Sequence, residues 1–122
     1  SMQDRELYVS NNLTQTLTEV FSTIGETAQK NGNANCFFID EIQYMKQNQL
    51  GSLIAALHRA NQLGYPIMII GAGLPKIYKM LSDEKSYSER LFMYKKIDSL
   101  TDEQSEKAIE EPAKKIQYNI CT

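Results

Sequence analysis

The sequence predicts an α/β fold in which parallel strands alternate with helices. Two runs of consecutive apolar residues, at positions 36–39 and 67–70, have the length and composition of strands buried on both faces. Segments whose apolar residues recur every three or four positions, as in helices, flank and separate these runs. Alternation of this kind is typical of a parallel sheet with helices on its faces.

The first half of the chain contains three predicted elements. A helix over Asn11–Lys30 is expected to end at Gly32 and its flanking asparagines, which tolerate the left-handed conformation of a helix stop. A strand follows at Cys36–Asp40, and Cys36 is interpreted as a small core residue. A second helix is predicted over Gln47–Gln62, with Leu50, Leu53, Ile54 and Leu57 on one face.

The second half continues the alternation. A strand is predicted at Pro66–Gly71, since a proline is tolerated as the first residue of a strand. A short helix is predicted at Leu74–Leu81, and a weaker third strand within Phe92–Leu100. Thr101 and Gln104 form a capping-box pattern that opens a last helix, which Pro112 is expected to break or restart.

Composition excludes several classes of protein. The 122 residues suffice for one domain or part of one, and the net charge of −2 is spread without a basic stripe for nucleic acid. The longest apolar stretch, Ile67–Leu74, is far shorter than the roughly 20 residues of a membrane span. His58 is the single histidine, and the two cysteines lack metal-ligand spacing, which disfavours a zinc site. A reducing cytoplasm is the expected compartment.

Two adjacent carboxylates at the end of the first predicted strand are the most informative motif. Asp40 and Glu41 follow four apolar residues directly, and Gln43 lies two positions further on. Acidic groups beside a core are costly unless a metal ion, water or a basic partner meets them. The pattern fits a nucleotide hydrolase, with one carboxylate near Mg²⁺ and one near the attacking water, while Gln43 could orient water or contact a phosphate. The alternative is a pair of acids that starts a loop.

Two further motifs are weaker on their own. Gly71 and Gly73, at the end of the second predicted strand, would allow the backbone to approach a ligand, but a tight strand-to-helix turn is the preferred interpretation of the glycines alone. Arg90 could reach the phosphate of a neighbouring subunit, because guanidinium groups grip phosphate oxygens in a fork. A surface salt bridge to Glu89 or Asp83 is the simpler interpretation of this arginine.

The phosphate-binding loop of a nucleotide hydrolase is missing. None of the six glycines belongs to a Gly-x-x-x-x-Gly-Lys-Ser/Thr motif. Without that loop the chain has no backbone nest for the β- and γ-phosphates and no lysine to neutralise them. The chain alone is therefore expected to bind neither ATP nor Mg²⁺.

Together these motifs resemble the C-terminal part of the nucleotide-binding core of AAA+-type P-loop ATPases, especially the bacterial and archaeal group related to origin-recognition and signal-transduction NTPases. Residues 37–43 resemble the Walker B strand, residues 67–75 the strand and turn of sensor 1, and residues 88–92 the arginine-finger segment. The resemblance implies a partial P-loop three-layer sandwich over residues 1–100 and the start of a truncated helical lid over 101–122.

The resemblance also implies roles for single residues. Asp40 would hold the water shell of Mg²⁺, Glu41 would polarise the attacking water, and Arg90 would act on ATP bound to a neighbouring subunit. Gln43, Gly71 and Gly73 would lie against the nucleotide. The sensor 1 strand usually ends in a polar side chain, and glycines stand there in this chain. The parent protein would be an oligomeric ATP hydrolase that remodels or loads a macromolecular client, protein or DNA.

The missing segments lead to one further expectation, and two other functions are alternatives to the ATPase. The family's first strand lies in the middle of its sheet, so its absence would leave apolar strand edges that favour self-association of the chain. An alternative function is a short non-catalytic α/β module that binds a protein partner through its open sheet edge. A receiver-like phosphoacceptor domain is disfavoured, because no second strand-end aspartate and no well-placed lysine accompany Asp40.

Overall fold

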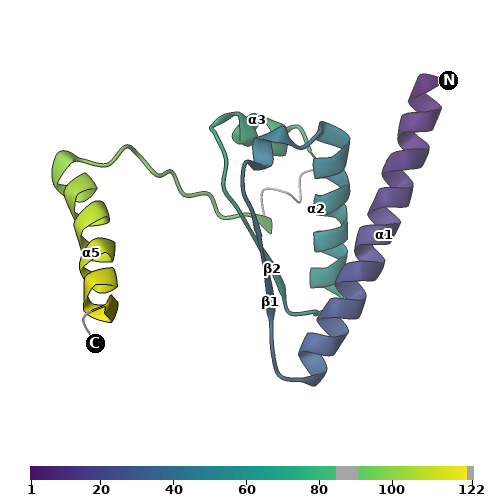
Figure 1. Cartoon of the computed structure of the whole chain (residues 1–122). Coiled ribbons are helices and arrows are strands. Elements are labelled where there is room, and N and C mark those ends of the chain that lie inside the picture. The colour runs from purple at the N-terminus through teal and green to yellow at the C-terminus, as the bar shows by residue number, and fades with distance from the viewer. Residues whose placement is uncertain (85–90, 121–122) are drawn as a thin grey trace.

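A computed structural model describes the backbone of residues 1–84 and 91–120, and the side chains of these residues as far as 112 (Figure 1). Helices make up most of the described chain, and the only strands there form one two-stranded sheet. No helix in the described segments is long and apolar enough to cross a membrane. The elements in chain order are α1 Met2–Lys30, β1 Asn35–Ile39, the 3₁₀ turn η1 Ile42–Tyr44, α2 Gln47–Gln62, β2 Ile67–Gly71, α3 Lys76–Ser82 and α5 Asp102–Ile120.

Helices α1 and α2 pack against each other and form one layer beside the sheet (Figure 1). Helix α2 has the predicted bounds. Helix α1 begins at Met2 rather than at the predicted Asn11, and Ser1 and Asp4 form a capping box at its start. The turn after α1 contains Gly32 at φ 68°, which confirms the expected helix stop.

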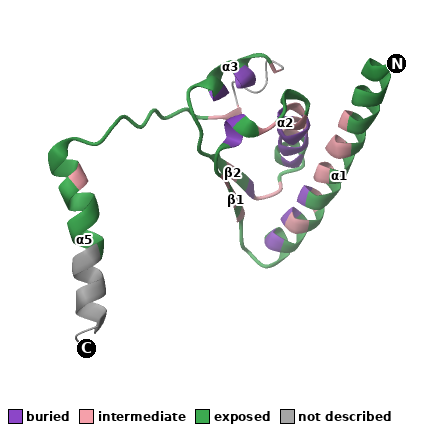
Figure 2. Ribbon diagram, turned by 45° about the horizontal axis from the view of Figure 1, so that its top comes forward, coloured by how far each residue is buried: buried purple, intermediate pink, exposed green. Residues whose placement is uncertain are grey.

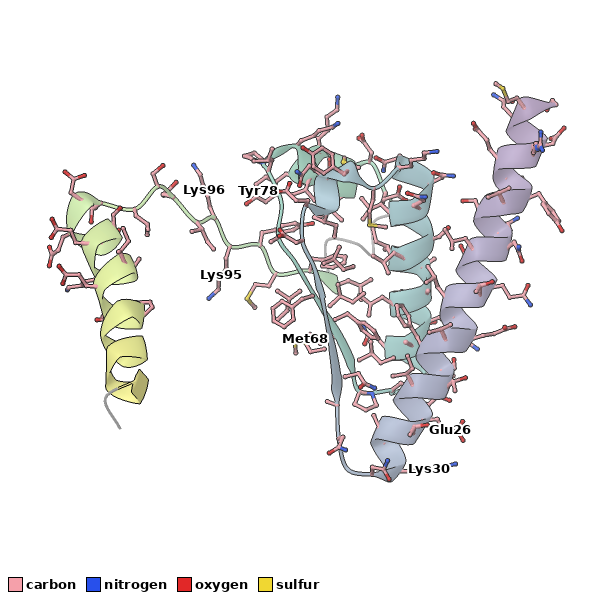
Figure 3. All side chains as sticks on the ribbon, in the orientation of Figure 1. Glu26, Lys30, Met68, Tyr78, Lys95 and Lys96 are labelled. Atoms are coloured by element: carbon pink, nitrogen blue, oxygen red, sulfur yellow. The ribbon has the colours of Figure 1, made fainter. Side chains whose placement is uncertain are left out.

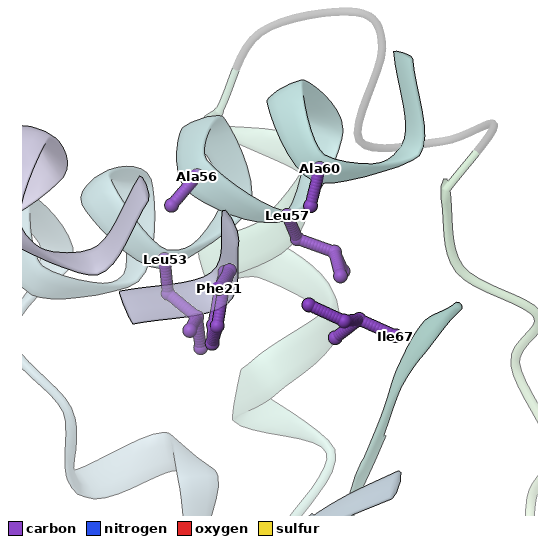
Figure 4. Close-up of a cluster of buried hydrophobic side chains, with 6 residues drawn as sticks. All are labelled: Phe21, Leu53, Ala56, Leu57, Ala60 and Ile67. Atoms are coloured by element: carbon purple, nitrogen blue, oxygen red, sulfur yellow. The ribbon is translucent and has the colours of Figure 1, made fainter. Parts of the chain in front are cut away.

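Strands β1 and β2 are parallel and pair in register from Asn35 opposite Ile67 to Ile39 opposite Gly71. One face of this pair lies against the helices. Phe21 of α1 and Phe37 of β1 have ring centroids 5.7 Å apart. One of two buried clusters of six residues joins α1, α2 and β2 and consists of Phe21, Leu53, Ala56, Leu57, Ala60 and Ile67 (Figure 4).

The expected three-layer α/β sandwich is wrong for this chain. The sheet has two strands, and α1 and α2 cover only one of its faces (Figure 1). The predicted third strand is absent, because residues 92–100 carry no helix or strand. Phe92 packs against the core at the start of this segment, but the chain then leads away from the fold, so the segment does not reach a strand edge. We call residues 93–100 the linker.

The other face of the sheet is open to solvent, which also corrects the expectation that both strands are buried on both faces. We define the open sheet face as Cys36, Phe38, Met68 and Ile70, which occupy alternate positions and pair across the strands. Phe38 is 78% exposed and Met68 60% exposed, and Cys36 is exposed rather than a core residue. Figure 2 shows how burial is concentrated between the sheet and the helices.

The C-terminal helix α5 stands apart from the rest of the fold (Figure 1). Its predicted capping box is confirmed: the N–H of Thr101 donates to Gln104 Oε1 at 2.9 Å, and the N–H of Gln104 donates to Thr101 Oγ1 at 3.2 Å. The predicted break at Pro112 is wrong, because this residue lies inside the helix. Because proline has no N–H, the carbonyl four residues before it loses its helical donor. On an exposed helix, water can donate to this carbonyl instead.

Candidate functional site

The two parallel strands end side by side, and two backbone hydrogen bonds connect their ends. The N–H of Ala72 donates to the carbonyl of Ile39 at 2.9 Å, and the N–H of Ile42 donates to the carbonyl of Ala72 at 3.0 Å. The structure therefore brings the carboxylate pair after β1 next to the glycine turn after β2. This is the sheet edge at which ligands of parallel α/β folds bind.

Asp40 and Glu41 are both exposed at this edge. Asp40 Oδ1 accepts a hydrogen bond from the backbone N–H of Glu41 at 2.8 Å. Glu41 has φ 53° and ψ 42°, and it is the one non-glycine residue with positive φ among the described residues. Such a conformation is unfavourable for a residue with a Cβ, so the surrounding contacts must hold it in place.

Gln43 supplies one of those contacts. Its side chain is 4% exposed, and its Nε2 donates to Glu41 Oε2. Its Oε1 accepts a hydrogen bond from the backbone N–H of Leu74 at 3.1 Å. The carboxamide thus links the carboxylate of Glu41 to the turn that follows β2. Sequence reasoning expected Gln43 to face water or a phosphate, whereas in the structure both ends of the amide bond to protein groups.

The two glycines of the turn make room for protein rather than leaving an open space. A Cβ added to Gly71 would lie 2.9 Å from Ile42 Cδ1. One added to Gly73 would lie 2.7 Å from Gln43 Oε1 and 2.9 Å from Ile42 Cγ2. Both glycines therefore allow η1 to pack closely on the end of β2. This observation favours the tight-turn interpretation of the motif over direct contact with a ligand.

The structure adds two groups that sequence reasoning missed. Ile42 is 6% exposed and covers both glycines, and the backbone N–H of Leu74 anchors Gln43. The position of Ile42, an apolar residue directly after two acids, could have indicated that it is buried. Nothing in the sequence indicated the role of the backbone N–H of Leu74. The proposed arginine finger, Arg90, lies outside the described residues.

The chemistry available at this edge is that of two solvent-exposed carboxylates, of which Glu41 is oriented by a buried amide. No group of three or more metal-ligating side chains lies within the residues that the structure describes. Asp40 and Glu41 fit a magnesium ion only if phosphate oxygens and water complete its coordination, which is the usual arrangement for Mg²⁺ at nucleotides. A shallow hollow of about 290 Å³ lies elsewhere, between the last turns of α1 and the start of β1.

Comparisons with known proteins found no matching family model, no similar curated protein and no similar solved structure. The assignment of a function to this site therefore depends on its own residues and geometry.

Proposed function

We propose that Asp40 and Glu41 form the metal-and-water half of an ATP-hydrolysing site whose phosphate-binding half belongs to a longer protein. In this proposal Asp40 holds the water shell of Mg²⁺ and Glu41 polarises the water that attacks the terminal phosphate. ATP and Mg²⁺ bind the longer protein, and the chain of 122 residues alone binds neither. Arg90 is the candidate finger toward a neighbouring subunit.

The observation that carries the proposal is the way Glu41 is held. A glutamate in the left-handed region costs stability, and a buried glutamine fixes its carboxylate at the carboxyl end of a parallel strand. Unfavourable backbone conformations that are held by their surroundings concentrate at functional sites. A carboxylate that only solubilises a loop needs neither the strain nor the buried amide.

The longer protein would couple ATP hydrolysis to the remodelling or loading of a macromolecule, as an oligomer in the cytoplasm. The first test is the gene. An upstream reading frame that encodes Gly-x-x-x-x-Gly-Lys-Ser/Thr supports the proposal, because this motif supplies the missing phosphate nest and lysine. If translation starts at Met2 instead, no phosphate-binding half precedes the chain and the proposal is wrong.

The second test is calorimetry of the chain with MgATP. We expect no saturable binding up to millimolar nucleotide, since the sequence contains no Gly-x-x-x-x-Gly-Lys-Ser/Thr motif to form a backbone nest for the phosphates. Sub-micromolar binding would show that the chain carries its own phosphate site, and it would overturn the division of the site into two halves.

A second candidate function is a non-catalytic interaction module, and the open sheet face favours it. Phe38, Met68 and Ile70 expose apolar surface on adjacent strands, and contiguous exposure of this kind marks interaction sites. In this case the chain associates with itself or with another protein through the sheet. A well-behaved monomer at micromolar concentration by light scattering would count against self-association.

A further inference from the structure

We infer that helix α5 of one copy of this chain lies on the open sheet face of a second copy, in a reciprocal exchange. This inference rests on the self-association proposed above and names the segment and the surface that produce it. Three features of the described residues support it: the uncovered sheet face, the detached helix and the charges that border each of them.

Among the described residues no helix covers the open sheet face, and α5 stands apart from the other elements (Figure 1). Phe38 is 78% exposed and Met68 60% exposed on the face away from α1 and α2, and Ile109 of α5 is 73% exposed. The sequence continues the apolar spacing of α5 at Ile116 and Ile120. A helix of 19 residues is about 28 Å long, which exceeds the roughly 17 Å of a strand of five residues. One α5 is therefore long enough to cover both strands.

The linker explains why the partner is a second copy. Phe92, just before the linker, packs on the core, and the ring of Tyr94 in the linker has its centroid 5.4 Å from that of Tyr78, so the start of the linker is anchored. Beyond this anchor the chain is extended and carries α5 away from its own sheet (Figure 1). A helix held out on an extended connection is placed to exchange with an identical copy, and a reciprocal exchange buries the open face of both chains.

Lysines near the strand ends have the opposite charge to the acidic turns of α5, and the exposed acids Asp40 and Glu41 lie at the same strand ends. Lys76 and Lys79 lie on α3, which packs on η1 near the strand ends, whereas Lys95 and Lys96 lie on the linker that leads away from the sheet (Figure 3) and that also contains Asp98. The first three turns of α5 are strongly acidic. Within residues 101–112 a single lysine, Lys107, accompanies Asp102, Glu103, Glu106, Glu110 and Glu111.

These charges set the direction of the exchanged helix. With Asp102 and Glu103 of its first turn beside Lys76 and Lys79 of the second copy, α5 extends down the strands and places Ile109 toward Met68. The exposed pairs Lys96–Asp98 at 3.5 Å and Glu103–Lys107 at 3.3 Å are weak and can rearrange.

Light scattering of the whole chain over micromolar concentrations tests the inference. We expect a dimer that Phe38→Asp and Ile109→Asp each weaken at least tenfold. Ile109→Asp leaves the fold intact, because α5 stands apart from the core. Tyr8→Asp is the matched control, since Tyr8 is an aromatic residue 73% exposed on α1, and it should leave the dimer unchanged.

The possible failures are distinguishable. A monomeric parent chain overturns the proposed self-association and the exchange together. A dimer that Phe38→Asp disrupts but Ile109→Asp does not keeps self-association and overturns the role of α5. A dimer that only Tyr8→Asp disrupts assigns the interface to α1 and overturns the exchange.

Disulfide trapping separates exchange from closure within one chain. The variant Ile109→Cys with Cys121→Ser keeps Cys36 on the open sheet face as the second thiol. Mild oxidation should give a covalent dimer on non-reducing electrophoresis. A fast-migrating monomer, in which Cys36 is bonded to the introduced thiol of the same chain, would show that α5 covers its own sheet and would overturn the inference. Cys121→Ser alone is the control: equally rapid dimerisation would mean that two open faces meet through Cys36, and it would overturn the exchange.

Discussion

The carboxamide oxygen of Gln43 accepts a hydrogen bond from the backbone N–H of Leu74 at 3.1 Å. This bond joins the end of β1 to the turn after β2, and the nitrogen of the same amide holds the carboxylate of Glu41. The position of the exposed carboxylate of Glu41 thus depends on a buried side chain, Gln43. The first two predictions follow from this link.

Gln43→Leu should lower the free energy of unfolding by about 1–2 kcal/mol. The substitution keeps the buried volume but leaves the N–H of Leu74 and the carboxylate of Glu41 without their partner. Urea unfolding followed by circular dichroism measures the change. Gln15→Leu, at an exposed helical glutamine, is the control and should change stability by less than about 0.5 kcal/mol. Equal effects of the two variants would mean that the bridge contributes nothing.

Gly73→Ala should destabilise the same turn by about 1–3 kcal/mol through crowding. The new Cβ would lie 2.7 Å from Gln43 Oε1, so it displaces the amide from Leu74. In a Gln43→Leu background the bridge is already lost, and the cost should be smaller. A double-mutant cycle measures this coupling. Strictly additive losses would show that Gly73 and Gln43 act independently.

Glu41→Gly should leave the chain about 1 kcal/mol more stable than Glu41→Ala does, because only glycine relieves the left-handed conformation at φ 53°. Both variants remove the carboxylate. Comparing the two variants in the same unfolding assay therefore isolates the backbone term. If alanine proves as stable as glycine, Glu41 is not strained and the argument for a functional conformation loses its support.

Two helical glycines should respond in opposite directions to alanine. Gly25→Ala should cost about 1–3 kcal/mol, because its Cβ would lie 2.6 Å from Tyr65 Cβ, an atom fixed to the backbone. Gly51→Ala meets only the carboxylate end of Glu84 at 2.8 Å, which can move, and alanine favours the helix. We expect it to be neutral or stabilising by up to about 1 kcal/mol. Thermal unfolding checks both, and a stabilising Gly25→Ala would contradict the close packing of α1 on Tyr65.

Local patterns predicted the elements of this fold better than its architecture. The apolar spacing of α2 gave its bounds, and the Thr101–Gln104 capping box marked the start of α5, because both signals are encoded within a few residues. The runs at β1 and β2 are equally apolar at inward and outward positions. Whether a strand is covered on one face or two depends on distant segments, so the pattern could not show that Phe38 is exposed.

The candidate site was predicted in part. Parallel pairing placed Asp40 and Glu41 beside the glycine turn, as the order of the elements indicated. The amide of Gln43 holds Glu41 and is itself bonded to the N–H of Leu74, which lies 31 positions further along the chain than Gln43. Sequence patterns identify residue types at strand ends, but they do not show whether an amide there faces a ligand or the protein.

Hydrolysis of ATP by the longer protein that we propose contains this chain tests the central claim most directly. Glu41→Gln should lower the rate of hydrolysis by about 10²–10⁴-fold while ATP binding is retained, because an amide cannot polarise the attacking water as a carboxylate does. Glu26→Gln, at an exposed glutamate that pairs with Lys30 on α1, is the matched control and should hydrolyse ATP at the unchanged rate. An unchanged rate in Glu41→Gln would contradict the assignment of this carboxylate to ATP hydrolysis.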